Sequence, residues 1–430
     1  MFCDMCFILK NMDKFVISGG KELKGEIEIA GSKNTILPCI AASLLTEEEI
    51  ILENVPEISD VASMIEILQT LGAEVNYDKP KKILAVNSKK VSSFEITETL
   101  GKKLRASILL SGPLLGRFKK AALPYPGGDN IGRRPLTTHL NALIKLGVSK
   151  KENDLLELNA ENFKSAPIIL EEPSVTATEN TILASVLMPG TTEIHLAAAE
   201  PHVQNLIALL NLMGAKISWK DIGVIKIDGV KKLKGAEFKM NPDEIEISGF
   251  AALAAATRSS ILLRNVEFKY IDAVLLQLSK MKIPYRKIEN DLLIEKNPDQ
   301  YEAFRIQAGL YPKLISDHLP PFAVLATQAK GESLIHEWLY EGRLKYIEEL
   351  QKMGASTKIL DPHRAIIKGP TRLKGTELIS YDVRAGLTVI IAALVAEGET
   401  RISGIEHVER GYEKVEQRLQ KIGANIKRVG

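Results

Sequence analysis

The chain has few cysteines, few aromatic residues and almost no net charge. Three cysteines in 430 residues exclude a disulfide-stabilised scaffold and indicate a reducing, cytoplasmic compartment. The 56 Lys and Arg residues nearly balance the 54 Asp and Glu residues, and only 5% of the residues are aromatic. Without a basic stripe and interleaved aromatics, nucleic acid is not an expected partner. No apolar run approaches the roughly 18 residues of a membrane span, so a membrane is not expected either.

Several common catalytic motifs are also absent. The sequence contains no Walker A motif, no GxGxxG after a strand, no HExxH and no GxSxG. Their absence disfavours P-loop nucleotide hydrolysis, hydride transfer, zinc proteolysis and serine hydrolysis. A lone CxxC, Cys3 to Cys6, is half of a zinc or redox site or, more simply, part of a disordered tail. Residues 1–11 lack the features of a signal peptide, and Met12 resembles a natural start, so we expect them to be an N-terminal extension.

A cassette of about seventy residues recurs six times along the chain. In each cassette a charge-poor helix pattern leads into a strand, and an amphipathic helix and a further strand follow. Glycine ends five of the six amphipathic helices, as is typical where the backbone turns left-handed at a helix C-terminus. The six helix ends are Leu71-Gly72, Leu146-Gly147, Met213-Gly214, Met281-Lys282, Met353-Gly354 and Ile422-Gly423.

The charge-poor segments predict six buried helices, because a helix that is apolar on all sides must be covered by protein. These segments are residues 35–45, 106–115, 178–187, 247–256, 319–328 and 385–396. Three cassettes could close around their buried helices. Six cassettes therefore predict two α/β domains, each of three strand–helix repeats, in agreement with the chain length.

A loop rich in glycine and proline, residues 124–135, interrupts the second cassette. It contains one carboxylate, Asp129, and two guanidiniums, Arg133 and Arg134. A loop with an acid and an anion-binding fork is a plausible catalytic lid that closes over a substrate. The alternative interpretation is a surface turn with a solvated salt bridge.

Charged and polar residues recur where the buried helices begin and where strands lead into helices. Their repeated placement favours one shared cleft that binds a small, highly anionic substrate and performs acid–base chemistry. The residues are Lys33, Asn34, Arg105, Asp317, Arg343, Asp382, Arg384 and Arg410.

Seven stretches resemble motifs of the UDP-N-acetylglucosamine 1-carboxyvinyltransferases, which are enolpyruvyl transferases, and the resemblance runs in register from about residue 12 to 430. The stretches are residues 31–34, 105–107, 126–135, 174–180, 200–202, 382–386 and 407–413. The resemblance implies two inside-out α/β domains with the active site between them. Residues 34–241 would form the first domain, with the mobile loop 124–135. Residues 12–33 and 242–430 would form the second.

The resemblance also implies an activity. The family transfers the enolpyruvyl group of phosphoenolpyruvate to the 3′-hydroxyl of UDP-N-acetylglucosamine and releases phosphate, which is the first committed step of peptidoglycan precursor synthesis. No metal and no organic cofactor are expected, and the expected form is a cytoplasmic monomer.

Individual residues match the family's functional positions. Lys33, Arg134 and Arg410 match phosphate contacts. Arg343 and Arg384 match residues that hold the carboxylate side of phosphoenolpyruvate. The other matches are Asp317, which would take the proton from the acceptor hydroxyl; Asp382, a supporting acid; Arg105, a further cation; and Asn34, His139, Ser174 and Val175 on the acceptor side.

Asp129 occupies a position where many members have Cys and some have Asp. The reaction needs a proton at the methylene carbon of phosphoenolpyruvate, and a carboxylic acid with a raised pKa can deliver it. A dianionic phosphate nearby would raise this pKa, and Arg134 would lower it. Because the loop contains no thiol, we expect the thiol-alkylating epoxide fosfomycin to be ineffective.

Three residues depart from the family pattern on the nucleotide side of the first domain. Thr137 replaces the usual Asp, Glu172 replaces a Lys of some members, and Ala199 replaces a common Arg. Two alternatives follow: transfer to another uridine nucleotide, or a catalytically degenerate paralogue that binds nucleotide sugars. The loop and the Arg-Gly-Tyr-Glu motif at 410–413 disfavour an enolpyruvylshikimate phosphate synthase, and a missing adenylation His disfavours an RNA-processing cyclase.

Overall fold

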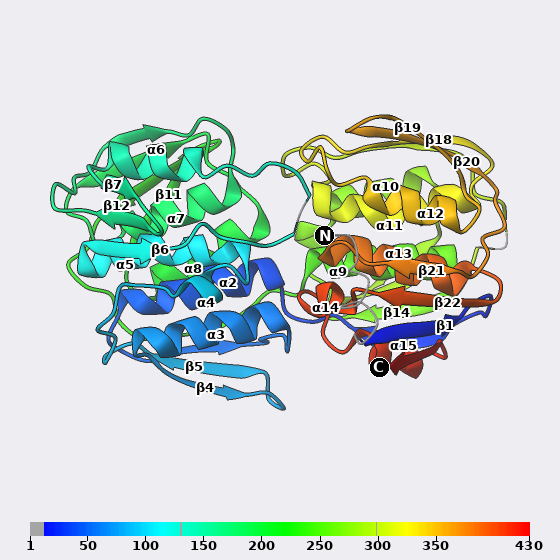
Figure 1. Ribbon diagram of the computed structural model, residues 1–430, viewed down its shortest axis with the longest axis horizontal. Coiled ribbons are helices and arrows are strands. Elements are labelled where there is room, and N and C mark those ends of the chain that lie inside the picture. Colours follow the sequence, from blue (N-terminus) through cyan, green and yellow to red (C-terminus); the bar gives the residue numbers. More distant parts are fainter. Residues whose placement is uncertain (1–12, 130, 298) are drawn as a thin grey trace. The chain divides into compact units, whose positions relative to one another are not determined.

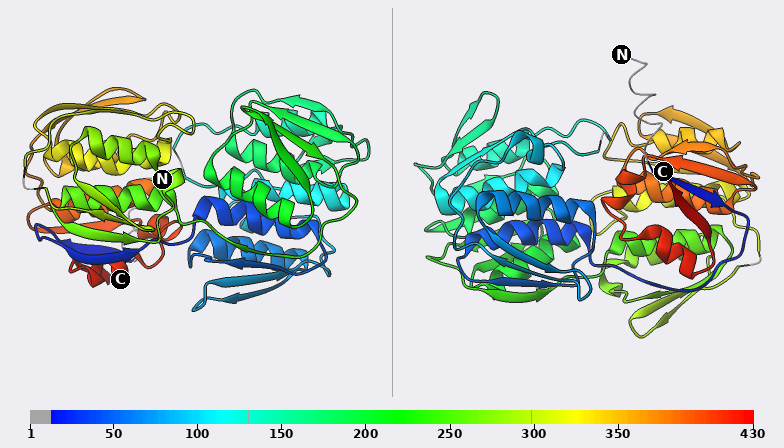
Figure 2. Two further views of the ribbon diagram at one scale, coloured as in Figure 1. Left: turned by 180° about the vertical axis from the view of Figure 1, so that it is seen from behind. Right: turned by 60° about the horizontal axis from the view of Figure 1, so that its bottom comes forward.

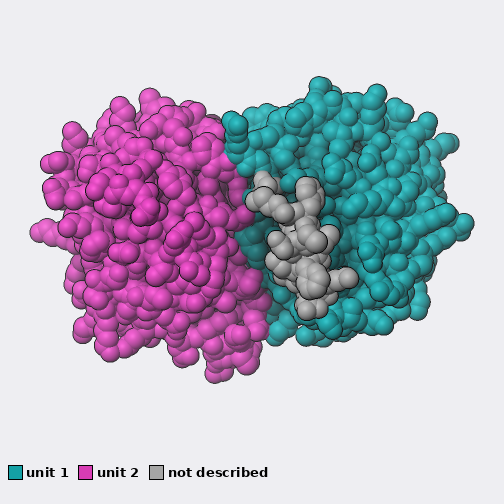
Figure 3. All heavy atoms as spheres, viewed as in Figure 1, with its two compact units in different colours: residues 1–30, 129–133, 242–430 teal, residues 31–128, 134–241 magenta. Residues whose placement is uncertain are grey.

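The computed structural model describes residues 13–129, 131–297 and 299–430 and divides into two compact units. Unit 1 contains the chain up to Ala30, the segment Asp129–Arg133 and Pro242–Gly430, and unit 2 contains the remainder (Figure 3). The sequence-based boundary after residue 33 is placed after Ala30 instead. Part of the loop 124–135 also belongs to unit 1 and not to the first domain, because Gly342 N of unit 1 donates to Ile131 O at 3.0 Å.

Unit 2 consists of three strand–helix repeats. Its elements in chain order are α2 (Lys33–Ala42), η2 (Ser43–Leu45), β3 (Ile50–Glu53), α3 (Ser59–Leu71), β4 (Glu74–Asp78), β5 (Ile83–Asn87), α4 (Glu98–Gly101), η3 (Arg105–Leu110), α5 (Ser111–Phe118), β6 (Lys120–Leu123), α6 (Thr137–Lys145), β7 (Ser149–Glu152), β8 (Leu156–Asn159), β9 (Pro167–Ile169), α7 (Val175–Ser185), β10 (Thr191–His195), α8 (Pro201–Leu212), β11 (Lys216–Asp221), β12 (Val224–Asp228) and β13 (Ala236–Lys239).

Unit 1 repeats the same plan with the remaining elements. They are β1 (Lys14–Ser18), β2 (Lys24–Glu28), α9 (Glu244–Ala256), β14 (Ser260–Arg264), η4 (Phe268–Tyr270), α10 (Asp272–Lys280), β15 (Tyr285–Ile288), β16 (Asp291–Ile294), β17 (Arg305–Gln307), η5 (Ser316–His318), α11 (Leu319–Gln328), β18 (Gly331–His336), α12 (Lys345–Lys352), β19 (Ser356–Asp361), β20 (Arg364–Gly369), β21 (Glu377–Ile379), α13 (Val383–Val395), β22 (Glu399–Ser403), α14 (Ile405–Glu409), α15 (Val415–Lys421) and β23 (Asn425–Val429).

The fifth repeat shows how each small sheet is built. Its strand order is β17-β18-β20-β19, with β17 and β18 parallel and the other pairs antiparallel. A parallel pair needs a crossover connection, and the buried helix α11 supplies it. Five sheets have four strands, and the sixth, β6-β8-β7, has a single parallel bridge from Glu95 to Ala122 in place of the fourth strand.

Three strands complete repeats that are distant in the sequence. Strand β2 pairs in parallel with β14 of unit 1, although the helix that follows β2 is α2 of unit 2. Strand β13 likewise pairs with β3 of unit 2 before the chain continues into α9 of unit 1. Strand β1 lies between β22 and β23 in the last sheet, so the first strand of the chain closes the sixth repeat (Figure 2). The predicted six repeats in two α/β domains are therefore confirmed.

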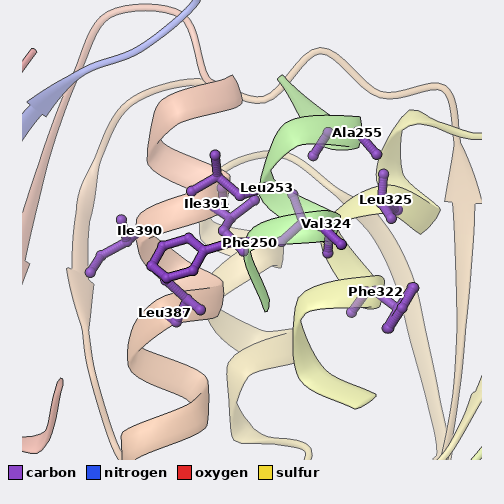
Figure 4. Close-up of a cluster of buried hydrophobic side chains, with 14 of the residues drawn as sticks. Phe250, Leu253, Ala255, Phe322, Val324, Leu325, Leu387, Ile390 and Ile391 are labelled. Atoms are coloured by element: carbon purple, nitrogen blue, oxygen red, sulfur yellow. The ribbon is translucent and has the colours of Figure 1, made fainter. Parts of the chain in front are cut away.

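The core of each unit is formed by its charge-poor helices. In unit 1, α9, α11 and α13 pack on one another, and their apolar side chains interlock (Figure 4). Phe250, Phe322 and Leu387 from these three helices have no exposed surface. In unit 2, α5 packs on α7, and α2 packs on η3 and α8. The strands and the amphipathic helices cover these cores (Figure 1).

Within the described ranges, none of the helices combines the length and the apolar character needed to cross a membrane. Cys39 is buried on α2 and forms no disulfide among the described residues. Cys3 and Cys6, and the predicted extension 1–11, lie outside the described residues.

Lys282 offers a test of the repeated helix ends. The five glycines after α3, α6, α8, α12 and α15 have positive φ, and Lys282 after α10 has φ +56°. A side chain in this conformation is strained by about 1 kcal/mol. Glycine removes this strain, but part of the gain is lost because glycine raises the conformational entropy of the unfolded chain. We expect Lys282→Gly to raise the unfolding free energy in urea by about 0.5 kcal/mol.

The matched control is Gly214→Ala, where a Cβ would meet no atom within 4 Å and φ is +99°. This variant should lose about 1 kcal/mol through backbone strain alone. A loss of stability in Lys282→Gly would contradict the equivalence of the six helix ends.

Candidate active site

A cluster of charged side chains in unit 1 forms where α11 and α13 begin. Asp317 lies in η5, directly before α11, and its Oδ1 is 2.7 Å from Nη1 of Arg343. Its other oxygen, Oδ2, is 3.3 Å from Nε of Arg384 on α13. Both arginines are buried, while Asp317 is partly exposed. The structure thus brings together three residues that the sequence singled out separately.

The charges of this cluster determine its protonation. Burial opposes ionisation of Asp317, but Arg343 and Arg384 outweigh it and hold the pKa of this carboxyl well below its usual value. Burial likewise disfavours the charged guanidinium of Arg343, but Asp317, Asp382 and Glu337 raise its pKa above the ordinary value. The cluster therefore contains an ionised carboxylate between two cations.

Asp382 caps helix α13. Its Oδ1 accepts hydrogen bonds from the backbone N–H groups of Arg384, at 2.8 Å, and Ala385, at 2.9 Å. Such a cap satisfies donors that the first turn of a helix leaves open. Burial raises the pKa of Asp382, Arg343 lowers it and Asp129 raises it. Asp382 is therefore within electrostatic reach of both the Asp317 cluster and the loop carboxylate.

Asp129 contacts Arg410 and His407 of unit 1. Nη1 of Arg410 donates to Oδ1 of Asp129, and Nδ1 of His407 lies 3.7 Å from the same oxygen. The Asp129 carboxyl raises the pKa of His407. Asn130, the next residue of the loop, lies outside the described residues. The loop acid and Arg410 were predicted to be functional, whereas His407 was quoted only as part of a motif.

Lys33 forms a buried ion pair in unit 2. Its Nζ lies 2.8 Å from Oδ2 of Asp60, in the first turn of α3, and both side chains are buried. Ser32 caps α2 by accepting from Thr35 N at 3.4 Å, so Lys33 and Asn34 occupy the first turn. Asp60 could not be singled out from the sequence, because an acid at a helix N-terminus is ordinary and nothing local relates it to Lys33.

Arg105 and Arg134 are neighbours in unit 2. Nη2 of Arg105 donates to the backbone oxygen of Arg134, and it lies 3.4 Å from the oxygen of Pro135. Arg105 begins η3, which continues into α5 and forms the start of the second buried helix. The Arg105 side chain thus fixes the end of the loop from which Arg134 projects.

The predicted acceptor-side residues of unit 2 lie around α7. Nε2 of His139 is 3.0 Å from Thr176 Oγ1, and its Nδ1 is 3.4 Å from the amide of Asn180. Burial and Arg105 lower the pKa of His139 to about 3, so the imidazole is neutral. Ser174 caps α7, accepting from Ala177 N at 3.4 Å, and Val175 is the first residue of that helix.

Thr137 and Glu172, two of the three residues expected to depart from the family pattern, also lie in this part of unit 2. Thr137 begins α6, and the next residue, Thr138, donates to Oε1 of Glu172 at 3.5 Å. The backbone oxygen of Ala199 accepts a hydrogen bond from Gln204 Nε2 at 2.8 Å. Residue 172 therefore lies beside the first turn of α6, where residue 137 begins the helix.

Two further residues of unit 1 support the Asp317 cluster. Ser316 Oγ accepts a hydrogen bond from Arg343 Nη1 at 2.7 Å and donates to Glu337 Oε2 at 2.5 Å. The sequence analysis singled out neither, because their contact joins positions 21 residues apart across a strand and a helix. In the part of the chain that the structure describes, no three His, Cys, Asp or Glu side chains are grouped to hold a metal ion.

Known proteins are similar to this chain over nearly its whole length. The family model of EPSP synthase (3-phosphoshikimate 1-carboxyvinyltransferase) matches residues 17–419. The chain is 43% identical over 424 residues to UDP-N-acetylglucosamine 1-carboxyvinyltransferase of Treponema denticola, covering 96% of this chain and 99% of that protein. It is 39% identical over 427 residues to the enzyme of the same name from Bradyrhizobium diazoefficiens, covering 97% and 98%.

Solved structures with the same fold include more distant proteins. The enolpyruvyl transferase NikO from Streptomyces tendae superposes with a TM-score of 0.89 at 21% identity, covering 97% of this chain and 99% of that one. EPSP synthase from Acinetobacter baumannii gives 0.77 at 17% identity, covering 97% and 100%. The matches first define a class, the EPSP synthase family of carboxyvinyltransferases. Within that class, the chain belongs to the UDP-N-acetylglucosamine 1-carboxyvinyltransferase family.

The Lys33–Asp60 pair predicts a stability effect. Asp60→Asn leaves a buried ammonium without its counter-charge, which costs about 3 kcal/mol. We therefore expect a clear fall of the melting temperature in thermal unfolding followed by circular dichroism. Lys33→Met combined with Asp60→Asn removes both charges and should lose less than the sum of the two single variants. Additive losses would contradict a direct pairing of the two side chains.

Proposed function

We propose that this protein transfers the enolpyruvyl group of phosphoenolpyruvate to the 3′-hydroxyl of UDP-N-acetylglucosamine and releases phosphate. The observation that carries the proposal is the Asp317 carboxylate bound by two buried guanidiniums. An anionic substrate can share these guanidiniums, and the carboxylate is already ionised and can accept a proton. The full-length relatives that bear the name of this activity support the assignment.

The proposed reaction adds the acceptor oxygen to C2 of phosphoenolpyruvate and a proton to C3. Asp317 takes the hydroxyl proton, and Asp129 in its acid form delivers a proton to C3. A proton then leaves C3 for the Asp129 carboxylate as phosphate leaves C2, which restores the double bond, and the phosphate carries away the proton that Asp317 took from the hydroxyl. Without substrate, Arg343 and Arg384 hold the pKa of Asp317 low. A substrate carboxylate bound to them would offset their charge and make Asp317 a stronger base.

The remaining residues are assigned to binding. Lys33, Arg134 and Arg410 hold the phosphate, and Arg343 and Arg384 hold the carboxylate of phosphoenolpyruvate. Lys33 is well suited to this task, because its pairing with Asp60 already orients the ammonium. The supporting residues are Arg105, a further cation; Asp382, which caps the helix that carries Arg384; and Asn34, His139, Ser174 and Val175, which contact the acceptor.

A second candidate is enolpyruvyl transfer to another uridine nucleotide. It is favoured by Glu172, whose carboxylate lies beside Thr138 at the start of α6 and would repel a diphosphate. A catalytically degenerate paralogue that binds nucleotide sugars is the other alternative. The proposed acid and base, Asp129 and Asp317, are both present and both bound by arginines. Their presence disfavours a degenerate paralogue.

We also propose that the protein acts in the cytoplasm as a monomer, without a metal or an organic cofactor. The small number of cysteines in the chain supports a reducing compartment. The monomeric state can be tested by sedimentation at several protein concentrations, and an unchanged sedimentation coefficient is the expected result.

Phosphate release tests the proposed activity. Mixed with phosphoenolpyruvate and UDP-N-acetylglucosamine, the protein should release phosphate only when both are present. Asp129→Ala should lower kcat by about 100-fold or more, as expected for the loss of a general acid. Asp154→Ala, which removes an exposed acid of unit 2, is the matched control and should retain full activity.

Two outcomes would contradict the proposal. Release of phosphate without the acceptor would indicate a phosphatase. No release, with phosphoenolpyruvate still bound in calorimetry, would point to a different acceptor, and other uridine nucleotides would then be assayed.

Fosfomycin tests the role of residue 129. An epoxide that alkylates a thiol should leave the wild-type protein active, because Asp129 offers a carboxylate bound by Arg410. Asp129→Cys should lose activity in fosfomycin over time and gain the mass of the inhibitor in mass spectrometry. A mass increase located on Asp129 of the wild-type protein, together with inactivation, would refute this expectation.

A further inference from the structure

Glu337 is a buried carboxylate that no assigned role explains. It follows β18, is only 1% exposed, and accepts the hydroxyl hydrogen of Ser316 at 2.5 Å. Ser316 Oγ in turn accepts from Arg343 Nη1, which also binds Asp317 at 2.7 Å. A chain of hydrogen bonds therefore runs from Glu337 through Ser316 and Arg343 to the proposed base.

Glu337 also organises its own turn. Its Oε1 accepts from the backbone N–H groups of Leu339, at 2.8 Å, and Tyr340, at 3.1 Å. Its backbone N–H donates to His363 O at 2.8 Å. The ring of Tyr340 lies 5.4 Å from the guanidinium of Arg343, a cation–π distance. The turn thus supports Arg343 from a second side.

The outer side of the same turn holds the loop that carries Asp129. Glu341 Oε1 accepts from the backbone N–H of Arg133 at 2.8 Å. Gly342 N donates to Ile131 O at 3.0 Å. All of these residues belong to unit 1. One turn of six residues therefore contacts both the support of the proposed base and the segment that follows the proposed acid.

We propose that Glu337 is a positioning residue for proton transfer, which orients Arg343 and Asp317 through Ser316 and holds residues 131–133 through its turn. The proposal rests on the proposed function, since it assigns Glu337 to the same reaction. It extends the site by two residues, Ser316 and Glu337, that do not touch the substrate.

The physical reason lies in the hydroxyl of Ser316. A serine hydroxyl can rotate and present either its hydrogen or a lone pair to a neighbour. Because the Glu337 carboxylate can only accept, the Ser316 hydrogen points to it and a lone pair is left for Arg343. Without this acceptor the hydrogen is free to turn toward the guanidinium, and Arg343 loses one of the two contacts that hold its Nη1.

Glu337→Gln tests the positioning role with little change in shape. The Gln oxygen can still accept from Leu339 N and Tyr340 N, but its NH2 group cannot accept from Ser316. We expect kcat to fall by about 10- to 100-fold, the size of effect that a 1 Å misplacement causes. The KM for phosphoenolpyruvate should rise, because Arg343 binds its carboxylate, while the KM for UDP-N-acetylglucosamine should stay within about threefold.

Glu349→Gln is the matched control. Glu349 on α12 is equally buried, accepts a hydrogen bond from the backbone N–H of Ile379 at 3.0 Å and binds Lys352, but it has no contact with Arg343 among those described. Both variants place an amide in the interior of unit 1, so a loss of folded protein would lower kcat alike in both. A rise of the KM for phosphoenolpyruvate only in Glu337→Gln separates positioning from stability.

Ser316→Ala is the second variant, which keeps the turn and removes only the bridge. Like Glu337→Gln, it should lower kcat and raise the KM for phosphoenolpyruvate. It also tests the proposal if Glu337→Gln does not fold. Wild-type kinetic constants in Ser316→Ala, or equal effects of Glu337→Gln and Glu349→Gln on both constants, would overturn it.

Crystal structures of both variants give a readout that does not depend on activity. We expect the distance from Arg343 Nη1 to Asp317 Oδ1 to lengthen by about 1 Å or the contact to be lost. If the wild-type protein releases no phosphate from phosphoenolpyruvate, the proposed function fails on its own. An Arg343 unmoved in both variant structures would refute the positioning role whatever the activity.

Discussion

The buried crossover helix is the constraint on which the rest of the structure depends. Each sheet contains strands that run parallel, and a parallel pair needs a crossover connection. In four repeats that connection is a charge-poor helix in the core, while α2 and α9 are the charge-poor helices that follow the two passages between the units. The N-terminus of each such helix is the first point where polar residues can return to the surface. Lys33, Arg105, Ser174, Asp317 and Asp382 all stand at or beside such a start. The fold thus assigns the same structural position to residues of the candidate site in five of the six repeats.

The backbone N–H groups at these helix starts explain why acids and hydroxyl groups recur there. The first backbone N–H groups of a helix have no partner inside it and favour negative charge. Asp382 meets this need in α13 with its own carboxylate, and Ser32 and Ser174 meet it in α2 and α7 with a hydroxyl. Lys33, Arg105 and Arg384 then add full positive charges beside the partial positive charges of these backbone N–H groups. A small dianion or trianion is the class of ligand that such a surface suits.

Local patterns sufficed to predict the repeats and the buried helices, because both the hydrophobic period and the glycine at a helix end are local properties. Positions at helix starts also singled out most charged residues proposed for the candidate site. The partners of these residues could not be predicted. Asp60 meets Lys33 only through the packing of α3 on α2, and Glu337 meets Ser316 across a strand and a helix. The resemblance implied which domain holds β1, β2 and β13, but not the strands with which they pair, since pairing between distant strands leaves no mark on either segment.

The strand arrangement has a consequence for synthesis on the ribosome. Every residue of unit 2 lies between Gly31 and Asn241, so this unit can fold while the rest of the chain is still being made. Unit 1 cannot, because β1 is among the first segments to emerge and pairs with β22 and β23, the last two strands. Strand β1 therefore remains without its neighbours until β22 and β23 have been made, whereas β2 waits only for β14. The unpaired edges of β1 are the part of the nascent chain that needs protection longest.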